Sequence, residues 1–286
     1  MSAPAGHYQP LARLPEGKDS ILNKAFVGPK QPIIDGLPTF SSPYEEREWV
    51  KGHMAAAFRY WGKLGFGDGL AGHITVRDPV KPNHFWMNPA SEHFSMITKS
   101  MLVLVDEHGN ICPEGAQLPI NAAGFNIHTA IHAARPDVNA AAHCHSVHGK
   151  TWSAFGKPIE MLVQDSCAFY NNISVYNNFG GVVLAKEEGV NIAKAIGPTA
   201  KNCILQNHGL LTLGQTVDEA VYMFMTLDRL CYAQLLVEAA QASGIQRTLI
   251  GKEEAEFTSK VAGWFFGHLS PEYKLILKET KGEFLQ

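Results

Sequence analysis

Long apolar segments, an excess of basic residues and a paired-cysteine framework are all missing from this 286-residue sequence. No apolar run approaches the roughly 20 residues that a membrane helix needs, and the N-terminus lacks the charged-then-apolar pattern of a signal peptide. With 24 Lys and Arg against 27 Asp and Glu, the net charge is -3, so no basic surface for nucleic acid or anionic membranes is expected. We therefore expect a cytoplasmic protein whose partner is a small-molecule substrate, with no nucleic acid and no membrane.

The five cysteines are odd in number and include no CxxC pair, which argues against a disulfide framework. Cys144 lies between two histidines, but adjacent side chains on a strand point to opposite faces of the sheet. Cys144 and Cys203 are therefore expected to be reduced thiols in the core rather than metal ligands.

Strand-like and helix-like segments alternate along the middle of the sequence without internal repeats, which predicts one α/β domain at residues 43–245. Residues 1–42 are rich in proline and lack periodicity, so they are expected to form an extended arm. Residues 246–286 contain several aromatic residues, and we expect a helical tail that packs on the domain or on a neighbouring subunit. Within the domain, helices are predicted at 43–64, 121–135, 147–155, 187–196 and 216–240, and strands at 73–77, 84–87, 102–105, 138–145, 159–163, 181–184, 203–206 and 210–213.

Two of these helices carry recognisable start signals. Pro43 suits the first position of a helix, because the backbone N–H that it lacks would have no partner there. Thr216 and Glu219 have the spacing of a capping box, in which the side chains and backbone N–H groups of the first turn bond to one another.

Three histidines form the most informative pattern in the sequence. His143 and His145 lie two positions apart on a predicted strand, so both imidazoles point to the same face and can share a metal ion. An HxH pair arises readily by chance in a chain with 13 histidines, and His208 alone could be a turn histidine bonded to backbone. Because His208 lies between two apolar strands, in Asn207-His208-Gly209, the three together predict a divalent metal site with an open coordination position.

These histidines lie in two segments that resemble the class II aldolase/adducin family. Arg135 to His148 is similar to the family's RPDxxAxxHxH segment, and Leu205 to Leu211 resembles its second metal segment. The resemblance extends over about residues 45–240. It implies a three-layer domain with a mixed, mainly antiparallel sheet flanked by helices, in a homo-oligomer that is often a tetramer. It also implies one divalent metal ion per subunit, with zinc expected and iron, manganese or cobalt as alternatives, held by His143, His145 and His208.

The chain departs from the aldolases of this family at positions that carry their chemistry. Fuculose-phosphate-type aldolases transfer protons with a Glu eleven residues before the RP dipeptide, and that position is Gly124 here. The phosphate loop reads Gly72-His73-Ile74-Thr75, while Ala90-Ser91 and Ala122-Ala123 stand in place of the family's threonine-glycine and serine-serine pairs. Anion binding needs converging hydroxyls, N–H groups and cations, so a phosphorylated sugar is not the expected substrate.

Several other polar residues could supply acid/base or binding groups instead. His128 lies one helical turn after Gly124 on the same face, and because histidine titrates near neutral pH it is the first candidate for proton transfer. His73 and Glu92 are further catalytic candidates. The candidates for substrate binding are Arg77, which could pair with a carboxylate or form a structural ion pair, and Thr75, Ser91 and His93. Each of these residues could equally have a supporting or surface role.

The segments Arg77-Asp78-Pro79 and Phe85 to Pro89 look most like an adducin-related branch of the family, which is similar to iron oxygenases and decarboxylases of aromatic 2-oxo or hydroxy acids. We therefore predict a metal-dependent lyase that cleaves or decarboxylates a small non-phosphorylated hydroxy- or oxo-acid. Two alternatives stay open: a mononuclear iron oxygenase or decarboxylase acting on an aromatic acid, and a non-catalytic adducin-like assembly protein. The missing Glu favours the last alternative, whereas the retained histidines count against it.

Overall fold

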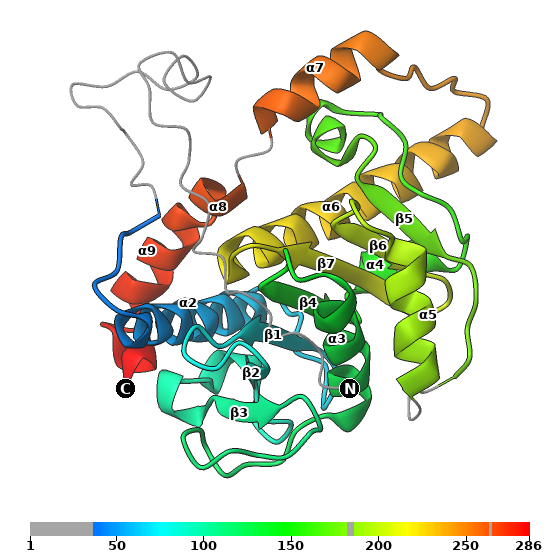
Figure 1. Ribbon diagram of the computed structural model, residues 1–286. Helices are drawn as coiled ribbons and strands as arrows, with labels where there is room; N and C mark the ends of the chain where they lie inside the picture. The colour runs from blue at the N-terminus through cyan, green and yellow to red at the C-terminus, as the bar shows by residue number, and fades with distance from the viewer. Residues whose placement is uncertain (1–36, 182–185, 263–264) are drawn as a thin grey trace.

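The computed structural model describes residues 37–181, 186–262 and 265–286, which form a seven-stranded sheet with helices on both sides (Figure 1). Neighbouring strands are antiparallel except for the last two in the sheet, which are parallel. This mixed, mainly antiparallel sheet confirms the predicted fold class. The strands lie in the order β3 (Val103–Asp106), β2 (His84–Met87), β1 (His73–Arg77), β4 (Ala140–Cys144), β7 (Gly209–Gly214), β6 (Asn202–Leu205) and β5 (Ile173–Tyr176).

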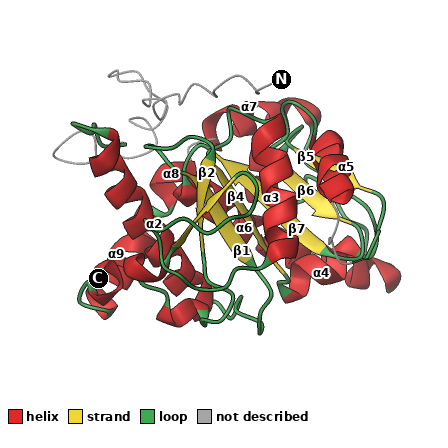
Figure 2. Ribbon diagram, turned by 60° about the horizontal axis from the view of Figure 1, so that its bottom comes forward, coloured by secondary structure: helices red, strands yellow, loops and turns green. Residues whose placement is uncertain are grey.

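Helices cover both faces of the sheet (Figure 2). The two longest described helices, α2 (Pro43–Lys63) and α6 (Val217–Ala242), pack with the apolar side chains of one face. The other face is covered by α3 (Ala122–Ala134) and α5 (Lys186–Ile196), which also contact each other. Burying apolar surface on both faces stabilises the three layers.

Strand β4 shows how the two faces differ. Ala140, Ala142 and Cys144 pack in the core that includes α2 and α6, whereas Ala141 packs with α3 and α5. Because side chains alternate along a strand, His143 points to the same side as Ala141. The predicted metal residue therefore faces the α3 side of the sheet, and Cys144 is a buried free thiol on the opposite face, as expected.

Both long helices begin as predicted, although the capping box of α6 is only half formed, because the Glu219 side chain accepts from the backbone N–H of Gln215 at 2.7 Å and not from that of Thr216. Pro43 is at the start of α2, where the Ser42 side chain accepts from the backbone N–H of Glu45 at 3.3 Å. At the start of α6 the Thr216 hydroxyl accepts from the backbone N–H of Glu219 at 3.0 Å. These contacts satisfy N–H groups that have no partner within the helix.

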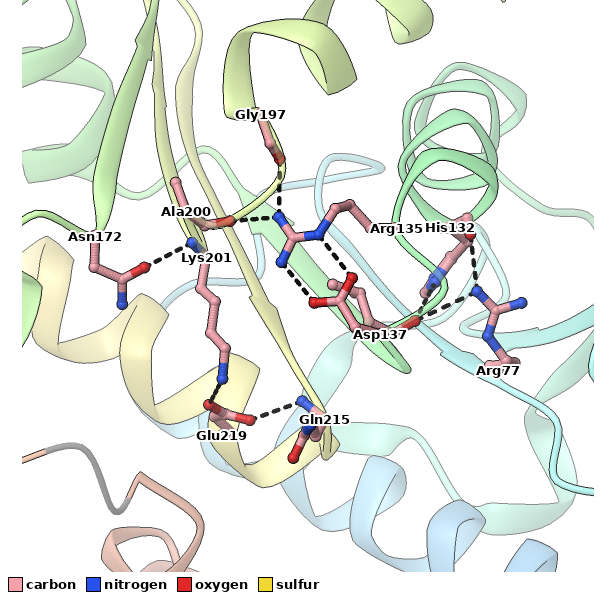
Figure 3. A network of polar contacts seen from close by, with 11 residues as sticks. Arg77, His132, Arg135, Asp137, Asn172, Gly197, Ala200, Lys201, Gln215 and Glu219 are labelled. Carbon is pink, nitrogen blue, oxygen red and sulfur yellow. Dashed lines mark hydrogen bonds and ion pairs between the residues drawn. The ribbon is translucent and has the colours of Figure 1, made fainter. Parts of the chain in front are cut away.

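A buried arginine fixes the start of β4 (Figure 3). Arg135 donates through Nε and Nη2 to the two carboxylate oxygens of Asp137, at 2.8 and 2.7 Å. Its Nη1 donates to the backbone carbonyls of Gly197 at 3.0 Å and Ala200 at 2.8 Å. The arginine therefore joins the end of α3 to the connection between α5 and β6. The Arg-Pro-Asp segment thus positions the strand that carries His143, and does not itself line the site.

Several predicted elements differ from those observed. The strand predicted at 159–163 is wrong, because this segment is a loop followed by a 3-10 helix at Gln164–Phe169. The backbone N–H of Glu160 donates to the Gln234 side chain at 2.8 Å, so it is satisfied without a neighbouring strand. Strand β5 was not predicted, and its residues are mostly half-buried, as befits a sheet edge. The strand predicted at 181–184 lies almost entirely outside the described residues.

The C-terminal segment forms helices that contact the domain. Helix α9 (Ser270–Glu279) lies against α2, and the short α8 (Phe265–His268) lies against α6. Helix α7 (Lys252–Ala262) contacts the 3-10 helix at Gln164–Phe169. Of the arm predicted at 1–42, only residues 37–42 lie within the described part of the chain. In the described ranges, no helix combines the length and apolarity that crossing a bilayer requires.

Candidate metal centre

The three predicted ligands converge from two places in the sheet. His143 lies on β4, His145 follows directly after that strand, and His208 lies on the turn between β6 and β7. One ring nitrogen from each lies within 4.8 Å of the others, and the Nε2 atoms of His145 and His208 are 3.1 Å apart. Three imidazole nitrogens this close match the ligand number of a catalytic zinc site, which keeps a further position for water or substrate.

The local backbone explains why the rings meet. Asn207 takes a left-handed conformation with φ of 58°, which short polar residues such as Asn tolerate better than most. This sharp turn places His208 beside the end of β4. His143 donates through Nδ1 to the carbonyl oxygen of Leu210 on β7 at 2.7 Å. Because a carbonyl only accepts, the proton is on Nδ1, and Nε2 carries the free lone pair that a metal would use.

Burial keeps these imidazoles in the ligand form. It lowers the pKa of His143 well below the ordinary value and lowers the pKa of His208 to about 4, with neighbouring histidines adding to both shifts. The pKa of His145 is also lowered by burial, and then by nearby Lys150. Neutral imidazoles suit zinc and similar divalent ions. The three histidines therefore fit the divalent metal ion that the sequence predicts.

The histidines line a pocket of about 670 Å³ between β1, α3 and the β6–β7 turn. Lys150 is the one lysine or arginine among its described lining residues, and its Nζ is 3.8 Å from a carboxylate oxygen of the exposed Asp68. None of the described lining residues is Asp or Glu. The pocket also has an apolar wall, which consists of Leu70, Ala71, Ala123, Ile127 and Phe179.

The structure places His73, a predicted catalytic residue, in this pocket. It is the first residue of β1 and pairs in register with His143 of β4. Its side chain lines the pocket, and the rings of His73 and His143 meet edge to face with centroids 5.1 Å apart. Burial lowers the pKa of His73 well below the ordinary value, with His128 the next contributor.

His128 and Thr75 lie behind the pocket rather than on its wall. His128 is fully buried, and its Nδ1 is 2.8 Å from the Thr75 hydroxyl oxygen. The same hydroxyl is 2.9 Å from Nε2 of His132. Neither His128 nor Thr75 is among the residues that line the pocket. Direct proton transfer to a substrate by His128 would need a rearrangement, because the His73 ring stacks on it, with centroids 4.4 Å apart.

The other predicted binding residues lie away from the pocket. Arg77 donates to the backbone carbonyl of His132 at 2.9 Å (Figure 3) and to those of Pro82 and Val138 at 2.8 and 3.4 Å. Its guanidinium therefore bonds to the backbone rather than to a substrate carboxylate. His93 is exposed, and its Nδ1 accepts from the backbone N–H of Ser95 at 3.1 Å. The remaining candidates that are absent from the pocket lining are Ser91 and Glu92.

The geometry of the three-histidine site agrees with the family to which the sequence is similar. The family described as "Class II Aldolase and Adducin N-terminal domain" matches residues 52–235. The chain belongs to this family.

Named relatives of this class II aldolase and adducin family member include enzymes. The chain is 45% identical over 204 residues to "Decarboxylase NovR" of Streptomyces niveus, covering 71% of this chain and 75% of that protein. It is 41% identical over 229 residues to "4-hydroxy-3-prenylphenylpyruvate oxygenase/4-hydroxy-3-prenylbenzoate synthase" of Streptomyces roseochromogenus subsp. oscitans, covering 79% and 82%. A similar solved structure is "L-fuculose 1-phosphate aldolase from Glaciozyma antarctica PI12", with a TM-score of 0.78, 40% identity and coverage of 87% and 96%.

The charged pocket residue of this class II aldolase family member was not among the site residues predicted from the sequence. Lys150 lies five positions after His145, within helix α4 (Val147–Ser153), which begins just beyond the metal segment. A helix that starts two residues after a strand-end ligand brings its first turns beside the ligand. The presence of a lysine in the first turns of this helix could therefore have indicated from the sequence that Lys150 reaches the site.

Proposed function

We propose that this protein is a metal-dependent lyase that decarboxylates a non-phosphorylated oxo acid with an apolar body. The observation that carries the proposal is the pocket, in which three neutral imidazoles converge beside one lysine and an otherwise largely apolar wall. The lysine suits a carboxylate, and the wall suits a hydrocarbon or aromatic group. The absence of an acidic side chain from the described lining residues also favours an anionic substrate.

His143, His145 and His208 would hold one divalent ion, for which zinc is the expected choice. When bound, such an ion polarises a carbonyl group and stabilises negative charge on its oxygen. The Nδ1 hydrogen bond from His143 to Leu210 fixes that ring with Nε2 toward the cluster. Second contacts of this kind orient ligands and raise their basicity.

Decarboxylation suits a pocket without a carboxylate base. When a carbonyl lies beta to the carboxylate, the C–C bond to CO2 breaks and its electron pair moves onto the carbonyl oxygen as an enolate. The enolate carbon then takes a proton from water. No proton is removed from carbon at the start, so the Glu missing at Gly124 is not needed. Lys150 would orient the carboxylate before CO2 departs, and the relative named as a decarboxylase supports this reaction type.

An iron-dependent oxygenase is the second candidate, because one relative is named as an oxygenase of a phenylpyruvate. A 2-oxo acid cannot follow the enolate route, since its carbonyl is attached directly to the carboxylate. Oxidative decarboxylation of such a substrate would use O2 as co-reactant, and iron is the metal among those expected that suits this chemistry. A non-catalytic adducin-like role is disfavoured by the intact cluster of three histidines. A homotetramer is our proposal for the assembly, because members of the family are often tetramers.

The test uses the full chain loaded separately with zinc, iron(II), manganese and cobalt. Acetoacetate and benzoylacetate serve as 3-oxo acids and phenylpyruvate as a 2-oxo acid, with CO2 release and O2 uptake followed in parallel. Release of CO2 from a 3-oxo acid without O2 uptake supports the lyase. Turnover of phenylpyruvate only with iron and O2 selects the oxygenase. The absence of both reactions, together with no binding of metal, would overturn the enzymatic proposal.

A further inference from the structure

His73 is a buried polar side chain with no hydrogen bond of normal geometry in the described part of the chain. It is 3% exposed, and both ring nitrogens lack such a bond, although the Gly124 backbone lies close enough to the ring to act on its pKa. Buried polar atoms are nearly always paired, because leaving them unpaired costs free energy. The ring nevertheless lines the pocket that contains the three-histidine cluster. An unpaired imidazole at this place is available to a ligand that enters the pocket.

The position of His73 depends on Gly124. A Cβ atom on residue 124 would lie 2.0 Å from both Nε2 and Cδ2 of the His73 ring. Gly124 is the third residue of α3, and glycine is generally a poorer helix former than alanine. The helix thus contains an unfavourable residue at the one point where the ring of His73 needs the space. A glutamate at position 124 and a histidine at position 73 could not both occupy this arrangement.

A chain of hydrogen bonds holds the residue on which His73 stacks. The carbonyl of Val138 can only accept, so His132 donates to it through Nδ1 at 3.2 Å, which leaves Nε2 of His132 as an acceptor. The Thr75 hydroxyl therefore donates to that Nε2 and accepts from Nδ1–H of His128. His128 is fixed in one orientation, and its ring lies nearly parallel to His73, at 18°. His128 is thus a positioning residue for His73.

We infer that His73 contacts the substrate directly, through a hydrogen bond between a ring nitrogen and a carbonyl or carboxylate oxygen of the oxo acid. A neutral imidazole has one N–H donor, and the oxygens of such an acid are acceptors. This inference rests on the proposed function. In it, the polar group that meets the substrate is His73 on β1, and not a residue at position 124 of α3. The glycine at position 124, where the related aldolases have Glu, leaves the space that the His73 side chain fills.

The dependence of His73 on Gly124 is tested by a double-mutant cycle that needs no substrate. Gly124→Ala should lower the Tm by several degrees when His73 is present, because the new methyl group collides with the ring. In a His73→Ala background the same change should leave the Tm unchanged or raise it. If the His73→Ala protein does not fold, His73→Ser provides the second background. An equal loss of Tm from Gly124→Ala with and without His73 would overturn the steric coupling.

Substrate contact is tested by calorimetric binding of phenylpyruvate to the zinc-loaded full chain, under conditions without turnover. His73→Asn should weaken binding at least tenfold while zinc content per subunit stays unchanged. His93→Asn is the matched control, since His93 lies outside the pocket, and it should bind like the unaltered protein. Unchanged binding by His73→Asn would overturn the inference alone, and loss of zinc would reassign His73 as a metal residue. Failure of the unaltered protein to bind phenylpyruvate, acetoacetate or benzoylacetate would overturn the proposed function as well.

Discussion

The Nε2 atoms of His145 and His208 face each other at 3.1 Å, although the two residues are 63 positions apart in the chain. Two neutral imidazoles can bond directly to each other only when one of them donates and the other accepts. A shared divalent ion would satisfy both lone pairs at once, which is the physical reason for considering this geometry a metal centre rather than a histidine pair.

Replacing His208 should abolish this centre. His208→Ala removes one of three ligand nitrogens, and we expect the bound divalent ion to be lost when measured by elemental analysis after dialysis. Added zinc should stabilise the unaltered protein, by about 2.7 kcal/mol at a hundredfold excess over Kd, and should not stabilise the variant.

The control for His208→Ala is His148→Ala. His148 bonds to Asp228 at 2.9 Å and lies outside the cluster of three histidines. The His148→Ala variant should therefore keep its bound metal ion. Equal zinc stabilisation of the His208→Ala variant and the unaltered protein would contradict the assignment.

Arg135 should contribute to stability rather than to catalysis. Arg135→Lys cannot donate to both oxygens of Asp137 and to the carbonyls of Gly197 and Ala200, because an ammonium group lacks the planar fork of a guanidinium. Leaving buried acceptors unpaired costs roughly 1–3 kcal/mol each, so we expect about 2–4 kcal/mol less stability by denaturant unfolding. The exposed Arg229→Lys is the matched control. A loss below about 0.5 kcal/mol would show that this network is dispensable.

Patterns local in sequence predicted most of the fold. Short segments rich in β-branched and aromatic residues predicted β1 and β2, and the capping signals predicted the starts of α2 and α6. The apolar segment at 159–163 was misleading, because the side chain of Gln234, far away in sequence, satisfies its backbone. Strand β5 has only four residues, which is too few to give a periodic signal.

The candidate site also has a part that local sequence predicts and a part that depends on tertiary packing. The spacing of the three histidines was informative because a strand and a turn determine where their rings point. Which polar residues reach the pocket depends on tertiary packing, so Arg77 and His93 were assigned binding roles although they bond to nearby backbone. The space at Gly124 is filled from another element, by His73. Neither fact follows from spacing along the chain.

The buried His132 should make stability depend on pH. Burial, and then Arg77, lower the pKa of His132 to about 3. The ordinary pKa of histidine is about 6.5. At pH values between about 3 and about 6.5, His132 therefore binds a proton in the unfolded chain but not in the folded protein. Stability contributed by this group is therefore complete above pH 6.5 and falls as the pH is lowered, by about 1.4 kcal/mol per pH unit.

The measurement is the free energy of unfolding between pH 4 and pH 7 for the unaltered protein and for His132→Gln. The variant should show a pH slope that is smaller by about one proton, whatever its absolute stability. His108→Gln, at a largely exposed histidine, should keep the original slope. An identical slope for His132→Gln and the unaltered protein would rule out this contribution.

Lys150 should govern the affinity for an acidic substrate more than the rate of its conversion. It is the one lysine or arginine on the described pocket wall, and its distance of 3.8 Å from exposed Asp68 is too long for a strong competing bond. Lys150→Met keeps much of the apolar length and removes the charge, so we expect KM for a reactive oxo acid to rise about 5–30-fold, as for the loss of a charge-assisted hydrogen bond. The turnover number should change less. Lys157→Met, at an exposed lysine outside the pocket, should leave KM unchanged. If Lys150→Met instead lowers kcat at constant KM, the lysine acts in the reaction rather than in binding the carboxylate.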